Sequence, residues 1–244
     1  AILTRSPALI LRAGVQNLAN SPNVPNSSRD TPGDNKPPNP LDDNAIFNPA
    51  SIFSNNLIAV ENIFTAGGPV ILSAGGDVVT RDINGGRIIL ESREGAVIVG
   101  GRLRSNSIIN IQANNNIVLT SDISRDDIKG SISLNTVRGN IVTRSIDTGT
   151  NGAIELRAFG DVNFGTLQGT KVDVTSNSGE LGVLSDPNII VFNTTPVNIT
   201  ATENLTLAAS RDLTVGELRG ATVSAISRNG AVATGAIATT GDVR

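Results

Sequence analysis

The side chains best suited to ligand chemistry are arginines. Five of them form the densest basic group of the chain: Arg81, Arg87, Arg93, Arg102 and Arg104. A guanidinium group binds a carboxylate or a related oxyanion through two parallel hydrogen bonds. We therefore take four of the five as candidates for contact with a partner or a saccharide. These four are Arg87, Arg93, Arg102 and Arg104. The simpler interpretation is a solvated surface on which these arginines pair with neighbouring acids and add little stability.

Two pairs of adjacent carboxylates have the residue types that glycoside hydrolysis requires. They are Asp42-Asp43 and Asp126-Asp127, and both lie in predicted loops. We expect these side chains to diverge and stay hydrated, and not to share a catalytic site. The segment S-D-I-S-R-D-D also offers loop oxygens of the kind that bind Ca²⁺. It lacks the Gly-Gly-x-Gly-x-Asp repeat of calcium-binding solenoids, so we expect no metal there.

The composition excludes several classes of site. The 244 residues contain no His, Cys, Tyr, Trp or Met. Without His or Cys, transition-metal centres, His-based triads, thiolate sites and disulfides are excluded. A net charge of -3 and 2% aromatic residues provide neither the basic patch nor the stacking platform that nucleic acids require. We therefore expect no cofactor, no nucleic-acid partner and no enzymatic activity.

The elements that must position these side chains repeat along the chain. Residues 86–101 (G-R-I-I-L-E-S-R-E-G-A-V-I-V-G-G) read as an apolar strand, a turn, a second apolar strand and another turn. Related segments recur about every twenty residues. We align them by one apolar residue in each first strand, at Val70, Ile88, Ile108, Ile132, Ile154, Val172, Leu205 and Val223. Most units add a third apolar step, at Ile83, Leu103, Ile123, Ile146, Leu167, Leu218 and Ile237.

This repeat predicts stacked short strands. The chain is rich in β-branched residues, which favour strands, and alternation places Ile154, Leu156 and Ala158 on the opposite side from Arg157. Three such strands joined by tight turns make a triangular coil, and coils stack with parallel strands about 4.8 Å apart. We therefore predict an all-β, triangular parallel β-solenoid with about 20 residues per coil and about eight or nine coils. A β-sandwich would not keep a twenty-residue repeat, and a propeller blade needs about forty residues.

Three regions of the chain differ in composition. Residues 1–18 hold one or two strand-like runs and are the candidate cap or exchanged strand. Residues 19–55 are rich in Pro and Asn and cannot bury enough apolar surface to offset their ordering entropy, so we expect a loop insertion, either a solvated excursion or a partner contact. Residues 56–244 are the predicted solenoid. An insertion near 185–203 is expected to form a partial coil or a flanking hairpin.

Aromatic and glycine residues mark positions that we expect to be special. Phe47, Phe53 and Phe64 cluster where the predicted solenoid begins, and we expect them to plug its end. Glycine pairs such as Gly85-Gly86 recur with the coil. No helix is predicted after them, so they are corners that require left-handed backbone and not phosphate-binding loops.

The repeat units resemble those of a known family. Segments such as G-G-P-V-I-L-S-A-G-G-D-V-V-T and G-A-I-E-L-R-A-F-G-D-V-N-F-G-T-L are similar to the repeats of filamentous-haemagglutinin-like proteins. Proteins of this family are exported by two-partner secretion and are common in cyanobacteria as well as in pathogens. The resemblance covers about residues 56–244 and implies a right-handed β-helix. It also implies an extracellular or outer-surface location in a bacterium and a role in adhesion or surface structure.

Our leading hypothesis is a non-catalytic, secreted or cell-surface scaffold that assembles into filaments or a surface layer. A solenoid without caps exposes unpaired strand edges, so its partners would be other copies of itself or the remainder of a longer chain, with surface glycans as a further class. The chain begins without Met and ends within a repeat, so we expect it to be part of a longer polypeptide. The alternative is a carbohydrate-binding or polysaccharide-cleaving β-helix. No run of 18 apolar residues occurs, so we expect no transmembrane helix.

Overall fold

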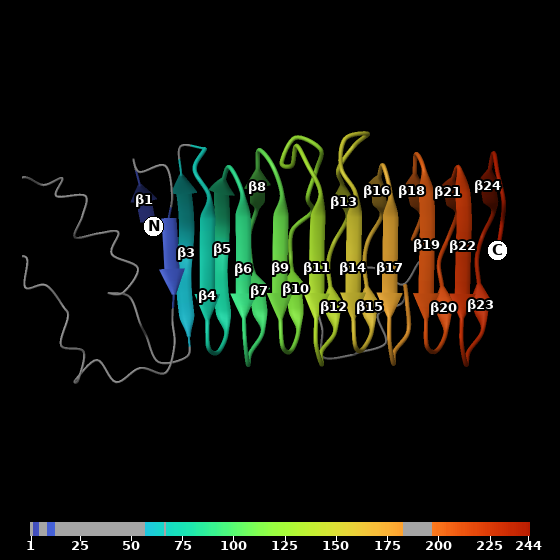
Figure 1. The fold of residues 1–244 in the computed structure, drawn as a ribbon, viewed down its shortest axis with the longest axis horizontal. Helices are drawn as coiled ribbons and strands as arrows, with labels where there is room; N and C mark the ends of the chain where they lie inside the picture. Colours follow the sequence, from blue (N-terminus) through green and yellow to red (C-terminus); the bar gives the residue numbers. More distant parts are fainter. Residues whose placement is uncertain (1, 5–8, 13–56, 66, 183–196) are drawn as a thin grey trace, which may run out of the picture.

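The strands of this chain stack along one axis into a rod (Figure 1). The computed structural model describes residues 2–4, 9–12, 57–65, 67–182 and 197–244. Within these ranges all regular elements are strands. Parallel strands recur about 20 residues apart and build a solenoid of about 8 turns, which confirms the predicted β-solenoid. No helix in the described part of the chain is long and apolar enough to cross a membrane.

Each coil contributes to three faces in turn. The first face is a nine-stranded parallel sheet, which lies toward the viewer in Figure 1. Its strands are β2 (Leu9–Arg12), β4 (Val70–Ala74), β6 (Ile88–Ser92), β9 (Ile109–Ala113), β11 (Ile132–Thr136), β14 (Ile154–Ala158), β17 (Val172–Ser176), β19 (Asn204–Ala209) and β22 (Thr222–Ser227).

The second face follows the first corner of each coil. Its strands are β3 (Ile58–Thr65), β5 (Val78–Gly85), β7 (Val97–Val99), β10 (Ile117–Leu119), β12 (Ile141–Val142), β15 (Val162–Asn163), β20 (Leu213–Thr214) and β23 (Val232–Ala233). Leu181 bridges Val162 to Leu213, so the ladder continues from β15 to β20.

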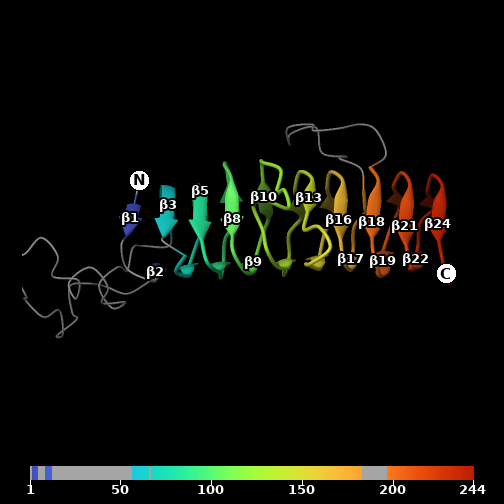
Figure 2. The same ribbon diagram turned by 90° about the horizontal axis from the view of Figure 1, so that it is seen from above.

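The third face completes each coil and is seen best from above (Figure 2). Its strands are β1 (Ile2–Thr4), β8 (Leu103–Ser105), β13 (Ile146–Asp147), β16 (Leu167–Gly169), β18 (Ile199–Ala201), β21 (Leu218–Gly220) and β24 (Ile237–Thr239). Strands β3 and β5 extend from the second face onto the third, where Ile63 pairs with Ile83 and Ile83 with Leu103. Strands β1 and β2 add in parallel to β3 and β4 of the same chain, and exchange of this segment between copies stays a prediction.

Aliphatic ladders fill the interior of the rod. Ile109, Ile132 and Ile154 are consecutive partners on the first face, and each is 1% exposed. Within β14 the predicted alternation is confirmed, because Ile154, Leu156 and Ala158 are buried and Arg157 is exposed. Burying one such aliphatic side chain stabilises by about 1.5–3 kcal/mol, and a coil can bury its inner face only against a neighbouring coil.

One predicted register was wrong by a single residue. We aligned the repeat on Ile108, but Ile88 pairs with Ile109, and Ile108 lies just before β9. Because Ile108 and Ile109 are adjacent and both suit the core, the local sequence does not show which of them pairs with Ile88. Ile111 and Ala113 decide it, because they share the inner face with Ile109 and a one-residue slip would turn all three outward.

The insertion near 185–203 ends in a regular coil. Strand β18 pairs with β16 before it and with β21 after it, so residues 199–201 belong to the third-face ladder and not to a flanking hairpin. Most of the remaining insertion, residues 183–196, lies outside the described residues, as do residues 13–56.

Two further predictions on special residues need correction. Phe64 is 38% exposed on the outside of the rod while Ile63 fills the core, so Phe64 is not part of a plug; Phe47 and Phe53 lie outside the described residues. Among the described glycines, only three have positive φ, at Gly67, Gly149 and Gly182. At Gly86, a Cβ would overlap the carbonyl oxygen of Gly67 in the preceding coil. Close approach of coils therefore explains this corner glycine, and left-handed backbone does not.

Candidate functional site

The most convergent set of charged side chains lies on the third face, where one coil carries extra residues. Arg102 and Arg104 flank Leu103 of β8, so both arginines are exposed while Leu103 enters the core. In the next coil, Ile123 bridges onward to Ile146, whereas Ile128 bridges back to Ser105. The four residues between Ile123 and Ile128 form a loop beside β8, which we call the 124–127 loop.

Asp127 is the centre of this set. Its Oδ1 accepts hydrogen bonds from Nε of Arg102 at 2.6 Å and from Nε of Arg104 at 2.9 Å. Its Oδ2 accepts from Oγ of Ser124 at 2.7 Å and from the backbone N of Ser124 at 3.2 Å. Asp127 is 3% exposed, whereas about half of each arginine side chain is exposed. A buried carboxylate thus holds two arginines whose outer parts remain in solvent.

The environment of Asp127 favours its ionised form. Burial opposes ionisation and raises the pKa of this carboxyl, but the hydrogen bonds from Ser124, Arg102 and Arg104 together outweigh burial. The pKa of Asp127 therefore lies below its ordinary value. A carboxylate that is already bonded to four donors, and that is harder to protonate than usual, is suited to positioning and not to acid or base catalysis.

Local sequence and backbone bonds fix the 124–127 loop. The backbone N of Asp127 donates to the carbonyl of Ser124 at 2.8 Å, while the Asp127 side chain accepts from the Ser124 backbone. This Ser-x-x-Asp pairing is similar to a capping box. The backbone N of Ser105 donates to the carbonyl of Asp127 at 2.6 Å, and the backbone N of Lys129 donates to the carbonyl of Ser105 at 3.1 Å. The loop is therefore tied to β8 on both sides of Ser105.

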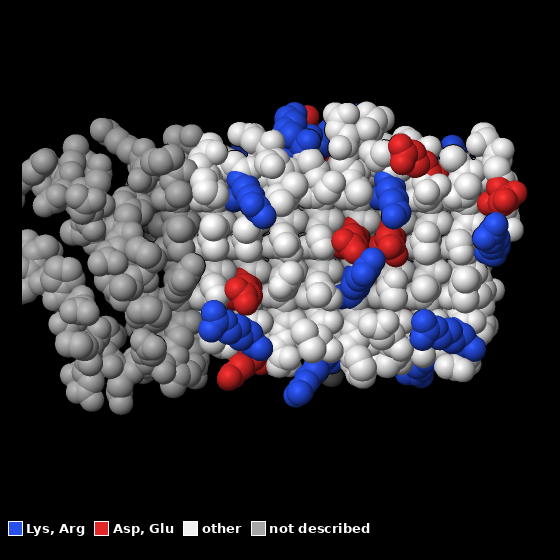
Figure 3. Space-filling model, viewed as in Figure 1, with Lys and Arg blue, Asp and Glu red and all other residues white. Residues whose placement is uncertain are grey.

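The four predicted arginines do not form one site. Arg102 and Arg104 come together at Asp127, but Arg87 and Arg93 flank β6 on the first face. Nε of Arg93 lies 3.8 Å from Oε1 of Glu91, and the two side chains are 66% and 43% exposed, so this long, solvated pair adds little stability. Charged side chains are sparse on the face seen in Figure 3, and both signs occur near each other.

The expectation that the paired carboxylates are hydrated was wrong for Asp127. Asp126 is exposed, but the adjacent Asp127 turns inward between the two arginines. Two sequence signals could have indicated this. The third-face step of this unit is longer than Leu103–Ser105, and Ser124 precedes Asp127 at capping-box spacing. The other pair, Asp42-Asp43, lies outside the described residues.

A polar hollow of about 230 Å³ adjoins the 124–127 loop. Nε of Arg125 lies 3.5 Å from Oδ2 of Asp147, whose Oδ1 accepts from the backbone N of Gly149 at 2.8 Å. The hollow is lined by Arg125, Asp126, Ile128, Lys129, Thr148, Gly149, Thr150, Asn151 and Gln168. Hydroxyl, amide and cationic groups predominate, which suits a polar ligand.

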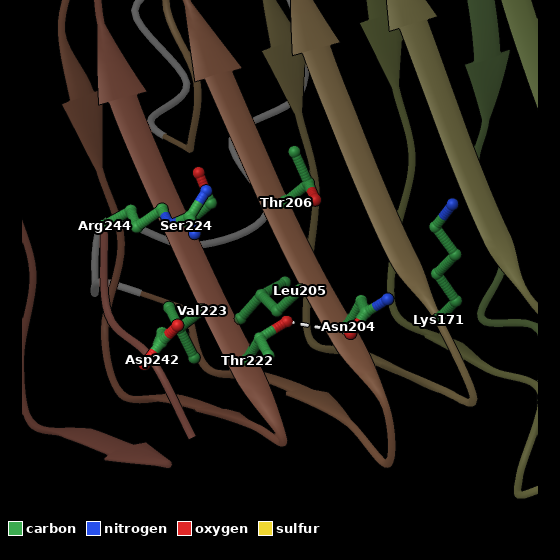
Figure 4. A pocket seen from close by; sticks show the side chains of 9 residues that line it. All are labelled: Lys171, Asn204, Leu205, Thr206, Thr222, Val223, Ser224, Asp242 and Arg244. Atoms are coloured by element: carbon green, nitrogen blue, oxygen red, sulfur yellow. Dashed lines mark hydrogen bonds between the residues drawn. The ribbon is translucent and has the colours of Figure 1, made fainter. Parts of the chain in front are cut away.

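A second hollow, of about 430 Å³, lies on the first face near its C-terminal end (Figure 4). It is lined by Lys171, Asn204, Leu205, Thr206, Thr222, Val223, Ser224, Asp242 and Arg244. Oγ1 of Thr222 donates to Oδ1 of Asn204 at 2.8 Å. Figure 4 shows Lys171 at one side and Asp242 at the other, with β19 and β22 between them. These charged groups do not converge on one point, so the hollow does not form a reaction centre.

A third hollow, of about 360 Å³, lies on the second face. Ala59, Val79 and Ile98 are consecutive ladder partners that line it, together with parts of Glu61 and Arg81. Its aliphatic side chains offer packing surface but no groups for chemistry.

Neither metal chemistry nor known relatives point to a function. Within the described residues, no group of three or more acidic side chains is placed to hold a metal ion. No protein-family model, curated protein or solved structure matches this chain. Function must therefore be inferred from the geometry of the chain itself.

Proposed function

We propose that this chain is a non-catalytic structural or adhesive β-solenoid of the bacterial cell surface, and that it works as a stiff rod that joins further solenoid coils through its end. The observation that carries this proposal is the coil-on-coil stacking itself, because each coil buries its inner face only against a neighbouring coil. The last coil of the sequence given illustrates this dependence. Three inward ladder residues there are 40–53% exposed: Val232, Ile237 and Val243. Their partners one coil earlier are at most 1% exposed: Leu213, Leu218 and Val223.

Stacking of another coil on this end is physically favourable. Full burial of one aliphatic side chain stabilises by about 1.5–3 kcal/mol, so covering three half-exposed side chains contributes a few kcal/mol. Strands β23 and β24 are the last of the second and third faces, and the edge of a last strand templates the addition of a parallel strand. The partner of matching chemistry is a coil of the same kind, from a second copy or from the remainder of a longer chain.

The rest of the outer surface fits a scaffold better than an enzyme. Asp127, the most buried of the described carboxylates, is occupied by four donors, and the charged groups around the first-face hollow do not converge. The secreted, adhesive part of the proposal is supported by the resemblance of the repeats to filamentous-haemagglutinin-like proteins. Carbohydrate binding is a second candidate, and the arginine pair at Asp127 favours it.

The end-stacking proposal is tested by sedimentation velocity over a range of concentrations. We expect the parent chain to form elongated, concentration-dependent assemblies. The double variant Val232→Asp/Ile237→Asp places charge on the open core and should remain monomeric with an unchanged circular dichroism spectrum. Ile226→Asp is the matched control, because Ile226 is 51% exposed on the outer side of β22 and does not belong to the inner ladder. A parent chain that stays monomeric at every concentration would contradict self-assembly.

A further inference from the structure

We propose that Arg102 and Arg104 form a binding site for a monoanionic group of an acidic polysaccharide, either a uronate carboxylate or a sulfate ester, and that Asp127 is the positioning residue of this site. The inference deepens the second candidate function, carbohydrate binding, and rests on it; it is independent of coil stacking, because the site lies on the third face and not at the end of the rod.

The first argument is pre-organisation. Each arginine uses Nε to bind the same oxygen of Asp127, at 2.6 and 2.9 Å. The Nη groups of both arginines make no hydrogen bond with any described residue, and none is a buried atom without a partner, so these groups face solvent. Two guanidinium groups fixed on one oxygen keep their remaining donors close together. The arginine side chains lose conformational entropy when the chain folds, so little further entropy is lost when they bind an oxyanion.

The second argument is charge. The two arginines share one carboxylate, Asp127, which is 3% exposed and lies beneath them. Two further carboxylates lie nearby: Oδ1 of Asp82 accepts a hydrogen bond from the backbone N of Arg102 at 2.7 Å, and Asp126 is exposed in the 124–127 loop. The exposed halves of the two guanidinium groups are the cationic part of the site, and a ligand with a single negative charge meets the least repulsion from Asp82 and Asp126. The same chemistry is offered by a uronate carboxylate and by a sulfate ester.

The third argument concerns the rest of the ligand. The polar hollow borders the same loop on the side of the following coils, and neither arginine lines it. Its exposed Thr150, Asn151 and Gln168 offer hydroxyl and amide groups that match the hydroxyl groups of a sugar, while Asp126 also lines it. The chain has no Trp or Tyr to stack on an uncharged sugar ring, so recognition must depend on the charged group. A nucleic acid would need a larger basic surface than two arginines and a net negative chain provide.

The experiment measures binding of the full chain to four polymers of matched length by isothermal titration calorimetry at about 0.15 M salt, where weak surface electrostatics are screened. The polymers are polygalacturonate, dextran sulfate, neutral dextran and poly-glutamate. We expect one or both acidic polysaccharides to bind and neutral dextran not to bind. The double variant Arg102→Gln/Arg104→Gln should bind about tenfold more weakly, which corresponds to the loss of one charge-assisted contact. The acidic polymer that loses affinity in this variant identifies the group as uronate or sulfate.

Two single variants separate a built site from general attraction. Arg157→Gln is the matched control, because Arg157 is also about half exposed but pairs with Glu155 and Asp173 on the first face. It should bind like the parent chain. Asp127→Asn adds positive charge to the chain but removes the group that holds the arginines, so we expect weaker binding. Circular dichroism melts confirm that each variant is folded.

Several results would overturn the proposal. They are no binding of either acidic polysaccharide, equal loss of affinity in Arg157→Gln and in the double variant, and tighter binding by Asp127→Asn. Binding of poly-glutamate as strong as that of the polysaccharides would replace the saccharide by an acidic polypeptide. Repeating the titration with the Val232→Asp/Ile237→Asp variant, which we expect to keep its affinity, shows that the site is independent of assembly.

Discussion

Nε of Arg102 donates a hydrogen bond to Oδ1 of Asp127 at 2.6 Å, although the two residues are 25 positions apart and belong to successive coils. Backbone ladders and the aliphatic core make most contacts between coils in this rod. The Arg102–Asp127 pair adds a charge-assisted contact on the outside. Because Asp127 is buried and Arg102 is half exposed, the pair both links two coils and presents a cation to solvent.

Replacement of Asp127 should destabilise the rod locally. Asp127→Ala removes bonds to Ser124, Arg102 and Arg104, while the arginines can regain water because they are half exposed. We expect a loss of about 1–3 kcal/mol in the free energy of unfolding, measured by urea titration. Asp126→Ala is the control, since Asp126 is exposed, and it should change stability by less than about 0.5 kcal/mol. Equal effects of the two variants would contradict the positioning role.

The contribution of Asp127 should depend on pH in a defined direction. Its pKa is lowered in the folded chain, because its hydrogen bonds outweigh burial. Its stabilisation is therefore fully present above the unfolded pKa of an Asp, about 3.9, and is lost as pH falls through the lower folded pKa. The difference in melting temperature between the parent chain and Asp127→Asn should be constant at neutral pH and shrink below about pH 4. A difference that grows in acid would contradict the assignment.

Gly95 should not tolerate a side chain, because of Asp77 in the preceding coil. Oδ1 of Asp77 accepts a hydrogen bond from the backbone N of Ala96 at 2.7 Å, and a Cβ on Gly95 would overlap this oxygen and the nearby backbone. We expect Gly95→Ala to cost about 1–3 kcal/mol. At Gly100 a Cβ would meet its nearest atoms at 3.7 and 3.9 Å, so Gly100→Ala should be close to neutral. Thermal melts of the two variants and the parent chain measure both effects. Similar losses at both positions would show that coil spacing is not the cause.

Truncation of core side chains to alanine should show whether the last coil is covered by another coil. Leu218 is fully buried, whereas its ladder partner Ile237 is 40% exposed. In dilute monomer, Leu218→Ala should cost about 2–5 kcal/mol and Ile237→Ala about 1 kcal/mol, because partial exposure reduces both the transfer and the cavity terms. In assembled material the cost of Ile237→Ala should rise toward that of Leu218→Ala. Calorimetry at low and high protein concentration measures both, and an unchanged cost would contradict burial of this end.

The sequence predicted the architecture well because the same physical constraint recurs in every coil. Inward positions such as Leu156 must be aliphatic in each unit, so the period and the strand type are visible without a structure. The exact register at Ile108-Ile109 was not visible, since both residues suit the core and only Ile111 and Ala113 resolve the choice.

The candidate site was harder to predict, because it depends on one irregular coil. The burial of Asp127 arises from the extra residues after Ile123, which fold back against β8. From positions along the sequence we predicted Asp127 in a hydrated loop and grouped Arg102 with Arg87. The fold puts these two arginines on different parts of the surface. Contacts between coils, and not spacing along the chain, decide which charges meet.

The measurement that tests the central claim most directly is electron microscopy of the parent chain and of Val232→Asp/Ile237→Asp at equal concentration. The claim is that a coil of this rod is completed by stacking against another coil of the same kind; in the last coil of the sequence given Val243 is 53% exposed, whereas its partner Val223 is 1% exposed. We predict filaments of constant width, several rods long, for the parent chain and single rods for the variant. Single, unjoined rods of the parent chain at every concentration, or filaments of the same length in the variant, would contradict it.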